Sequence, residues 1–295
     1  MSSIGVERRM LLVHAHPDDE TIFTGATMAK YAAEGARVSL VTCTMGERGF
    51  IPRTHPATRG RDLPPGDERM ELTAGIRAKE LEAACAELGV TEHWYLGGLG
   101  RWRDSGVKDC GDPRAFCSAG VDEAADELGA LIQRVQPQVM VTYDANGFYG
   151  HPDHIQAHRV AWRAYQQFCD PLRTRFYALT MPRSVLAGAI NDARQSQQGG
   201  SGKPVRPDSF PHVGLPDNQV EIEIRADSFM DAKLAALKAH ATQVAVDGHF
   251  FQAVGLVRMR VLTTEYYSRW PILAVGTGSP GELRGDDFFW GSGDW

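Results

Sequence analysis

Residues 10–20 read Met10-Leu11-Leu12-Val13-His14-Ala15-His16-Pro17-Asp18-Asp19-Glu20, an apolar run followed at once by a polar turn. The tripeptide His16-Pro17-Asp18 recurs as His151-Pro152-Asp153, after a second apolar run at residues 139–143. Each run is typical of a short buried strand. In open α/β sheets, ligands bind in the crevice beyond the carboxyl ends of the strands. One such tripeptide alone would be a proline turn, but two in equivalent positions predict a single site built from two distant segments.

Strand and helix patterns alternate around these two runs through about residue 180. Further strands are expected at residues 37–42, 92–96 and 220–224, and helices at residues 20–34, 67–88, 121–136, 154–168 and 226–240. This alternation predicts an α/β, Rossmann-like fold, a mostly parallel sheet flanked by helices. No G-x-G-x-x-G follows the first strand, and the Gly97-Gly98-Leu99-Gly100 sequence is expected to be a turn. Asp67 is expected near the N-cap of its helix.

Residues 195–216 are rich in Gly, Ser and Pro, as is typical of an excursion or a boundary between lobes. We therefore expect a Rossmann-like metal-binding core over residues 1–185. A smaller C-terminal lobe over residues 186–295 is expected to complete a substrate pocket.

The chain of 295 residues has a net charge of −6 and a pI near 5.9. Without a basic field, a nucleic-acid or anionic-membrane partner is not expected. No run approaches the length of a membrane span, and no stretch resembles a signal peptide. The five cysteines form no Cys-x-x-Cys pair, which favours a reduced, cytoplasmic protein. Cys43 is expected in the core.

His16, Asp19 and His154 offer two imidazoles and one carboxylate, a recurring catalytic metal arrangement. His16 and Asp19 are three residues apart at a strand-to-helix turn, so they can converge, and His154 can join them across the sheet. Asp18, beside a ligand but not itself one, can take a proton from metal-bound water, whose pKa falls to about 7.

The remaining polar residues of the second segment suit the same chemistry. His151 and Tyr149 are placed to contact an oxyanion or to protonate a leaving amine. Attack of water on a carbonyl, assisted by a metal, is amide or ester hydrolysis. Asp153 is expected to orient a ligand histidine rather than to bind the metal itself.

Other candidates have structural interpretations. Glu20 is expected to be a first-turn carboxylate at a helix dipole. His240 is expected to be a packing or hydrogen-bonding histidine, and Asp144 to cap a strand end. His14 is either structural or part of the site.

Five motifs, at residues 15–20, 41–49, 97–106, 149–154 and 239–243, resemble the LmbE/PIG-L-like zinc N-deacetylases. Within that family, Arg101-Trp102-Arg103-Asp104-Ser105-Gly106 resembles the deacetylases of mycothiol biosynthesis rather than the mycothiol S-conjugate amidases. The resemblance implies a substrate in which N-acetylglucosamine is linked to myo-inositol.

The resemblance also implies roles for individual residues. One zinc ion per subunit would be held by His16, Asp19 and His154. Asp18 would be the general base, while His151 and Tyr149 would stabilise the transition state. Arg77 and Asp104 match positions that hold sugar and inositol hydroxyls. Two histidines and a carboxylate also suit Fe²⁺, so an iron enzyme or a redox metalloenzyme stays open.

Two residues depart from the family pattern. Phe50 replaces an acidic residue, and Phe148 replaces a glycine in loops expected to border the pocket. The alternatives are therefore a mycothiol S-conjugate amidase or an antibiotic-tailoring deacetylase acting on another N-acyl amino sugar. A non-catalytic sugar-binding protein is a further alternative, although neither Asp18 nor a metal ligand has been lost. The expected partner is a small amino-sugar substrate; the oligomeric state is left open.

Overall fold

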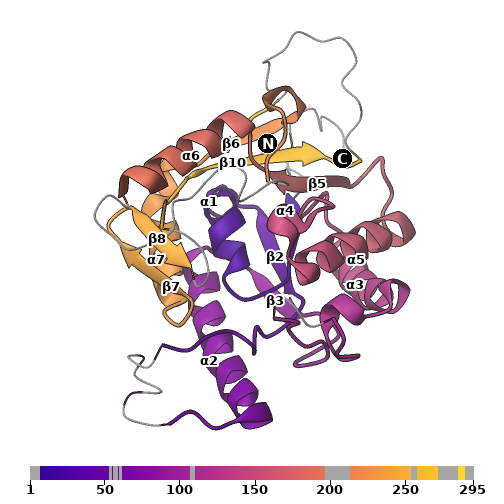
Figure 1. Ribbon diagram of the computed structural model, residues 1–295. Helices are drawn as coiled ribbons and strands as arrows, with labels where there is room; N and C mark the ends of the chain where they lie inside the picture. The colour runs from indigo at the N-terminus through magenta and orange to yellow at the C-terminus, as the bar shows by residue number, and fades with distance from the viewer. Residues whose placement is uncertain are drawn as a thin grey trace.

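The computed structural model describes residues 7–52, 55, 59, 62–106, 110–196, 213–253, 258–271 and 285–289. Its centre is a seven-stranded sheet in the order β3-β2-β1-β4-β5-β10-β6 (Figure 1). The strands are β1 (Arg9–His14), β2 (Arg37–Thr42), β3 (Glu92–Tyr95), β4 (Val139–Thr142), β5 (Arg175–Thr180), β6 (Ile222–Arg225) and β10 (Thr264–Arg269). Strands β1 to β5 pair in parallel, and β10 pairs antiparallel with β5 and β6. The expected α/β fold with a mostly parallel sheet is confirmed.

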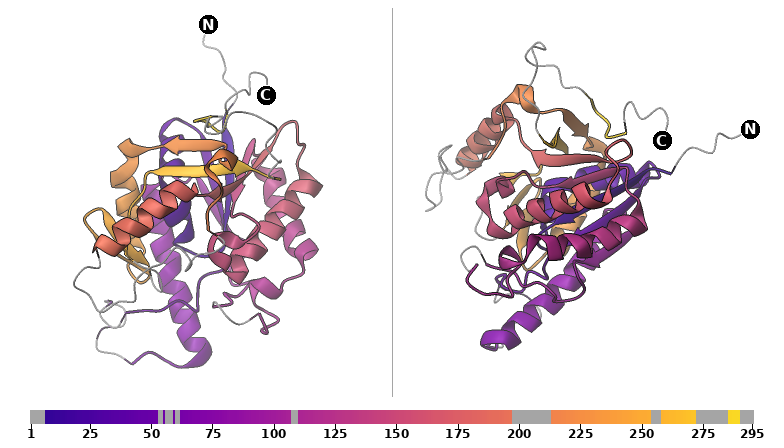
Figure 2. Two further views of the ribbon diagram at one scale, coloured as in Figure 1. Left: turned by 45° about the horizontal axis from the view of Figure 1, so that its top comes forward. Right: turned by 90° about the vertical axis from the view of Figure 1, so that its right-hand side faces the viewer.

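Helices flank both faces of this sheet (Figures 1 and 2). On one face α7 (Met230–Ala239) packs against α1 (Asp19–Ala33) and α2 (Gly66–Glu87), and on the other α3 (Val121–Val135) packs against α5 (Pro152–Phe168). The short helix α4 (Gly147–Gly150) precedes α5, and α6 (Arg183–Ser196) follows β5. A second sheet contains β7 (Val244–Asp247), β8 (Phe250–Ala253) and β9 (Met259–Arg260). Among the described residues, 3₁₀ turns cover Phe116–Ser118, Asp217–Gln219 and Asp227–Phe229.

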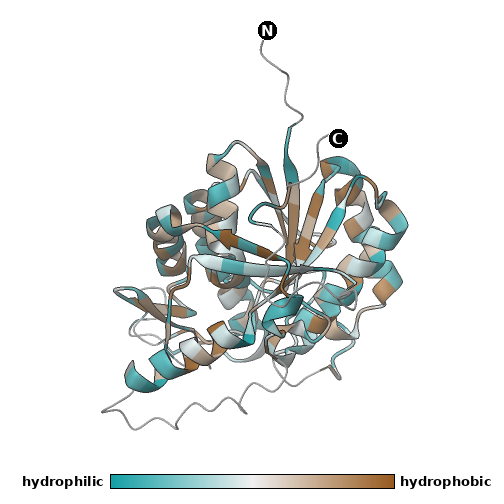
Figure 3. Cartoon of the chain, turned by 90° about the horizontal axis from the view of Figure 1, so that it is seen from above, coloured by the Kyte–Doolittle hydropathy of each residue, from teal (hydrophilic) through white to brown (hydrophobic). Residues whose placement is uncertain are grey.

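The central strands are apolar along their whole length because helices cover both of their faces. Residues Met10, Leu11, Leu12 and Val13 of β1 are completely buried, as are residues 139–141 of β4. Figure 3 shows this as hydrophobic colour concentrated on the strands between the two helical layers.

Strand β1 lies between β2 and β4, and the chain leaves β1 and β4 toward opposite faces of the sheet. The carboxyl ends of β1 and β4 therefore border a topological switch point, where open α/β sheets bind their ligands. The segment after β1 contains residues 15–20, and the segment after β4 contains residues 149–154. The switch point thus brings the two His-Pro-Asp segments together.

Several expectations about local structure need correction. Asp67 lies inside the first turn of α2, and Pro65 is the N-cap, without a side-chain cap. Cys110 and Cys117 form a disulfide, with Cα atoms 5.6 Å apart, so a fully reduced set of cysteines is wrong. Cys43 is a buried free thiol, as expected.

The division into two lobes stays a prediction. Strands β6 and β10 come from beyond residue 186 and join the main sheet, whereas the small sheet and α7 lie to one side (Figure 1). Most of the expected excursion at residues 195–216 lies outside the described residues. None of the described helices is long and apolar enough to span a membrane.

Candidate metal centre and active site

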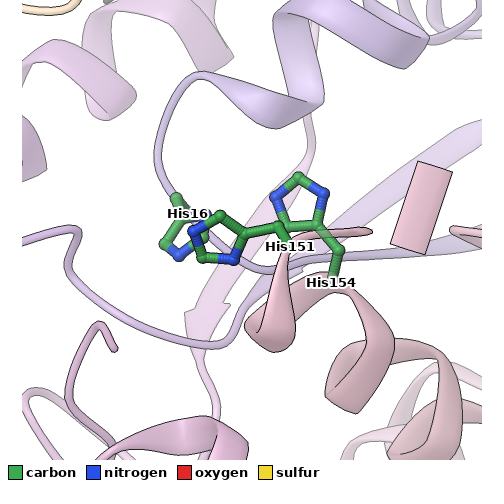
Figure 4. A group of neighbouring side chains, drawn as sticks. All are labelled: His16, His151 and His154. Carbon is green, nitrogen blue, oxygen red and sulfur yellow. The ribbon is translucent and has the colours of Figure 1, made fainter. Parts of the chain in front are cut away.

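Three histidine side chains meet at the switch point (Figure 4). His16 comes from the loop after β1, His151 is the N-cap of α5, and His154 lies in the first turn of that helix. The ring centroid of His16 lies 4.7 Å from that of His151 and 5.3 Å from that of His154. One ring nitrogen from each histidine lies within 4.8 Å of the others, close enough for all three to face one ion.

Asp19 lies between two of these histidines. Its Oδ2 atom is 3.2 Å from His16 Nδ1 and 3.3 Å from His154 Nε2. The Tyr143 hydroxyl, from the end of β4, donates to the same oxygen at 2.7 Å. The structure therefore brings together His16, Asp19 and His154, the three residues expected to bind a metal.

His154 shows that this donor set fits a metal ion. Its ring is completely buried and stacked on Tyr143, with centroids 4.1 Å apart. Neither ring nitrogen makes a well-formed hydrogen bond with a described residue. A buried imidazole whose nitrogens lack well-formed hydrogen bonds is costly unless something else binds it. Two imidazoles and a carboxylate form a donor set suited to Zn²⁺ or Fe²⁺.

Asp153 fixes the orientation of His16. Its Oδ2 atom lies 3.1 Å from His16 Nε2 and accepts from the backbone N–H and hydroxyl of Ser105 at 2.9 and 2.8 Å. Its Oδ1 atom accepts from the backbone N–H of Cys117 at 3.0 Å. With Nε2 directed at Asp153, the Nδ1 atom of His16 faces Asp19. Carboxylates bonded to the far nitrogen of a ligand histidine orient metal sites in this way.

The carboxylates around His16 create a field that favours a cation. Asp104 Oδ1 lies 3.5 Å from His16 Nε2, in addition to Asp153 and Asp19. Burial alone would lower the pKa of His16, but these three carboxylates hold it well above its ordinary value. The same field that attracts a proton would attract a metal ion to the vacated nitrogen.

Asp18 lies beside this cluster and is paired with Arg77. Burial raises the pKa of Asp18 to about 7, against the opposing charge of Arg77, whose Nη2 atom is 3.3 Å from Asp18 Oδ2. Arg77 also donates to the carbonyls of Pro17 and Gly46. A Cβ atom on Gly46, at φ +63°, would overlap the Arg77 guanidinium, so this close approach requires glycine.

His151 is a neutral hydrogen-bond donor toward the site. Burial and the neighbouring imidazoles of His16 and His154 lower its pKa to about 3. The backbone N–H of Asp153 lies 3.2 Å from His151 Nδ1 and donates to it, so the proton of the neutral ring is on Nε2. Tyr149 is partly exposed, with its ring centroid 5.0 Å from that of His154 and 6.1 Å from that of His151.

The two departures from the family pattern lie in different surroundings. The Phe50 side chain is 51% exposed. Phe148, at φ +62°, packs against Phe23 with centroids 4.9 Å apart. Phe148 and Phe23 line an apolar cavity together with Tyr149, Leu179 and Ile190.

Sequence reasoning gave no role in the site to Tyr143 or Ser105, or to the contact between Glu20 and His240. In the sequence, Tyr143 ends the apolar run at residues 139–143. Its position at the end of a strand that borders the site was the only sequence signal that its hydroxyl could reach Asp19. His240 Nε2 lies 2.7 Å from Glu20 Oε1. Burial alone would raise the pKa of Glu20, but the His240 imidazole outweighs this effect, and the pKa of Glu20 is about 2. His14 is structural, bonded to Thr24 and Tyr143.

Residues 11–165 match the family model "PIG-L: GlcNAc-PI de-N-acetylase". The chain therefore belongs to this family, and it is a hydrolytic N-deacetylase enzyme.

Two relatives match over nearly the full chain. The "1D-myo-inositol 2-acetamido-2-deoxy-alpha-D-glucopyranoside deacetylase" of Acidothermus cellulolyticus is 50% identical over 289 residues, which cover 96% of this chain and 95% of the relative. The protein of the same name from Thermobispora bispora is 46% identical, covering 93% and 90%. The crystal structure of the A40926 pseudoaglycone deacetylase, 19% identical, superposes with a TM-score of 0.53 over 91% of this chain and 100% of that one. That likeness shows the fold alone.

Proposed function

We propose that this enzyme hydrolyses the N-acetyl amide of N-acetylglucosaminyl-myo-inositol with a bound zinc ion. The observation that carries the proposal is the convergence of His16, Asp19 and His154 beside the uncoordinated carboxylate of Asp18. The substrate is supported by the two inositol-glycoside deacetylases to which the chain is similar over more than nine-tenths of its length.

The proposed ligands are His16, Asp19 and His154, one ion per subunit, with Asp153 orienting His16. When bound, zinc lowers the pKa of a coordinated water to about 7 and polarises a carbonyl oxygen. Fe²⁺ suits the same donors. Metal analysis after anaerobic purification, with an oxygen-consumption assay, would separate the two metals and detect redox chemistry.

Asp18 is the proposed general base. Its raised pKa, about 7, makes its carboxylate a stronger base than an exposed aspartate, and Arg77 keeps it ionised near neutral pH. Asp18 accepts a proton from the attacking water as the carbon–oxygen bond forms. The neutral Nε2–H of His151 and the hydroxyl of Tyr149 donate to the oxyanion that develops on the former carbonyl. The carbon–nitrogen bond then breaks, and the proton held by Asp18 passes to the leaving nitrogen, giving acetate and a free amine.

Arg77 and Asp104 are proposed to contact the hydroxyls of the sugar and the inositol. Both border the switch point, and Arg77 holds the Gly46 loop there as well. The lobe over residues 186–295 is proposed to complete the pocket, since its Met259 and Tyr266 line the apolar cavity beside Tyr149. That cavity favours a second candidate activity, removal of an acyl group from an amino sugar that carries a large apolar substituent.

Acetate release from a panel of substrates tests the proposal. The zinc-loaded enzyme should have its highest kcat/KM on N-acetylglucosaminyl-myo-inositol, a lower value on N-acetylglucosamine without inositol, and little activity after chelation. A mycothiol S-conjugate and an antibiotic N-acyl glucosaminide belong in the same panel. A higher kcat/KM on either of these would replace the proposed substrate, and no hydrolysis of any amide would overturn the proposal.

A further inference from the structure

The motif Ala239-His240-Ala241-Thr242-Gln243 has no part in the proposed chemistry, yet it lies directly behind the site. It begins at Ala239, the last residue of α7, and three of its residues each bind a different segment of the chain. His240 contacts Glu20 of α1, Thr242 donates to Glu80 of α2, and Gln243 donates to the carbonyl of Phe50. The contact with Glu20 leads to the proposed base.

Asp18 has a backbone conformation that a non-glycine residue seldom adopts, with φ 109° and ψ −31°. Such a conformation costs free energy, on the order of 1–3 kcal/mol, and persists only where its surroundings hold it. The carbonyl of Asp18 accepts from the N–H groups of Thr21 and Ile22 at 3.1 and 2.9 Å. Its own N–H donates to Glu20 Oε2 at 2.9 Å. The Glu20 carboxylate therefore holds the amide side of the strained residue.

Glu20 is itself held by His240. Both side chains are completely buried, and His240 Nε2 lies 2.7 Å from Glu20 Oε1. The Thr21 hydroxyl donates to the same oxygen at 2.5 Å. One carboxylate oxygen thus faces His240 and Thr21 while the other faces the backbone of Asp18. A buried carboxylate requires such a partner, because the desolvation of an unpaired charge is costly.

We propose that Glu20 and His240 are positioning residues of the deacetylation: His240 fixes the Glu20 carboxylate, and Glu20 fixes the backbone of Asp18 so that its side chain meets the attacking water. The inference rests on the proposed role of Asp18 as base. Neither Glu20 nor His240 touches the substrate or the reacting atoms in this scheme.

Steady-state kinetics of His240→Phe and His240→Gln test the inference on the zinc-loaded enzyme. Phenylalanine fills the space of the ring but cannot donate, whereas the glutamine amide can replace the Nε2 donor. We expect His240→Phe to lower kcat about 10- to 100-fold, since small displacements of a reacting group cost up to about 100-fold. KM and zinc content should stay within about twofold, because a displaced base alters the chemical step. His240→Gln should recover most of the kcat.

Tyr267→Phe is the matched control for loss of a buried side-chain contact with α1. Tyr267 lies on β10 and is completely buried, and its hydroxyl donates to the Thr27 hydroxyl in the middle of α1 at 2.7 Å. Tyr267→Phe should lower the melting temperature, as is expected of His240→Phe, while kcat stays within about twofold. An equal fall of kcat in the control would mean that His240 contributes only to packing, and this result would overturn the inference.

The double variant Glu20→Leu/His240→Phe keeps the test decisive if His240→Phe does not fold. It leaves no unpaired buried charge, and replacement of both partners by apolar residues is often tolerated. If His240 acts only through Glu20, the double variant has the same low kcat as Glu20→Leu alone. A normal kcat in the double variant would overturn the inference.

Asp18→Ala separates this inference from the proposed function. If Asp18→Ala is nearly inactive while His240→Phe is normal, the positioning role fails and the base role stands. If Asp18→Ala is active at full zinc occupancy, the proposed base itself fails.

Discussion

Replacing Asp18 with Asn removes a proton acceptor and little else. Asparagine has the shape of aspartate and tolerates positive φ, so the backbone at φ 109° can be retained. Its amide oxygen can still accept from Arg77, which lies 3.3 Å from the carboxylate of Asp18. Loss of a general base lowers kcat by about 10²–10⁴-fold. Zinc content should not change, because the proposed ligands are all retained.

The same substitution has a stability effect whose sign follows from the pKa of Asp18. Burial raises that pKa from 3.8 to about 7, so the folded chain binds more protons than the unfolded chain between these values. The contribution of this group to stability is complete below pH 3.8 and is lost as the pH rises through 7. About three pKa units correspond to at most about 4 kcal/mol. Asparagine does not ionise, so chelated Asp18→Asn should be increasingly more stable than the chelated parent as the pH rises.

Two assays check these expectations. Acetate release and zinc per chain are measured together for the loaded enzymes, and urea unfolding is measured for chelated samples at pH 5 and pH 8. A near-normal kcat at full zinc occupancy would remove Asp18 from the mechanism. A stability difference that is the same at both pH values would mean that Asp18 is not a buried carboxyl with a raised pKa.

Three further predictions concern the metal and the Gly46 loop. Asp153→Asn should weaken zinc affinity about 10- to 100-fold in a chelator competition, because His16 loses its orienting carboxylate; an unchanged affinity would show that His16 is held without it. Zinc binding to the chelated protein should release a proton, since the pKa of His16 is held well above its ordinary value, and affinity should fall as the pH falls. Equal calorimetric heats in two buffers of different ionisation enthalpy would contradict this. Gly46→Ala should lower both stability and kcat by displacing Arg77, whereas Gly66→Ala, at the similar φ of +61° with nothing within 4 Å, should lower stability alone; equal kcat values for the two variants would separate the Gly46 loop from catalysis.

The fold and the convergence of His16, Asp19 and His154 were predictable because both depend largely on local patterns. Buried parallel strands are continuous apolar runs, and the runs at residues 10–13 and 139–143 became neighbouring strands. His16 and Asp19 are close in sequence, so a strand-to-helix turn suffices to bring them together. The apolar strands and the turns that follow them could be predicted from the sequence. Strand β5, helix α6 and the insertion of β10 between β5 and β6 could not. The position of β10 depends on pairing with distant strands.

The sequence by itself determined the parallel strands β1 to β4, the pair of His-Pro-Asp segments, and the residue types that can bind a metal and move a proton. Only the tertiary structure decided how these groups are held. Tyr143 bonds to Asp19, Ser105 bonds to Asp153, and His240 meets Glu20 across 220 residues of sequence. The physical reason is that a buried charge needs a partner, but any part of the chain that folds nearby can supply it. Sequence spacing therefore identifies groups that act together within one turn, while packing selects the distant groups that fix their positions.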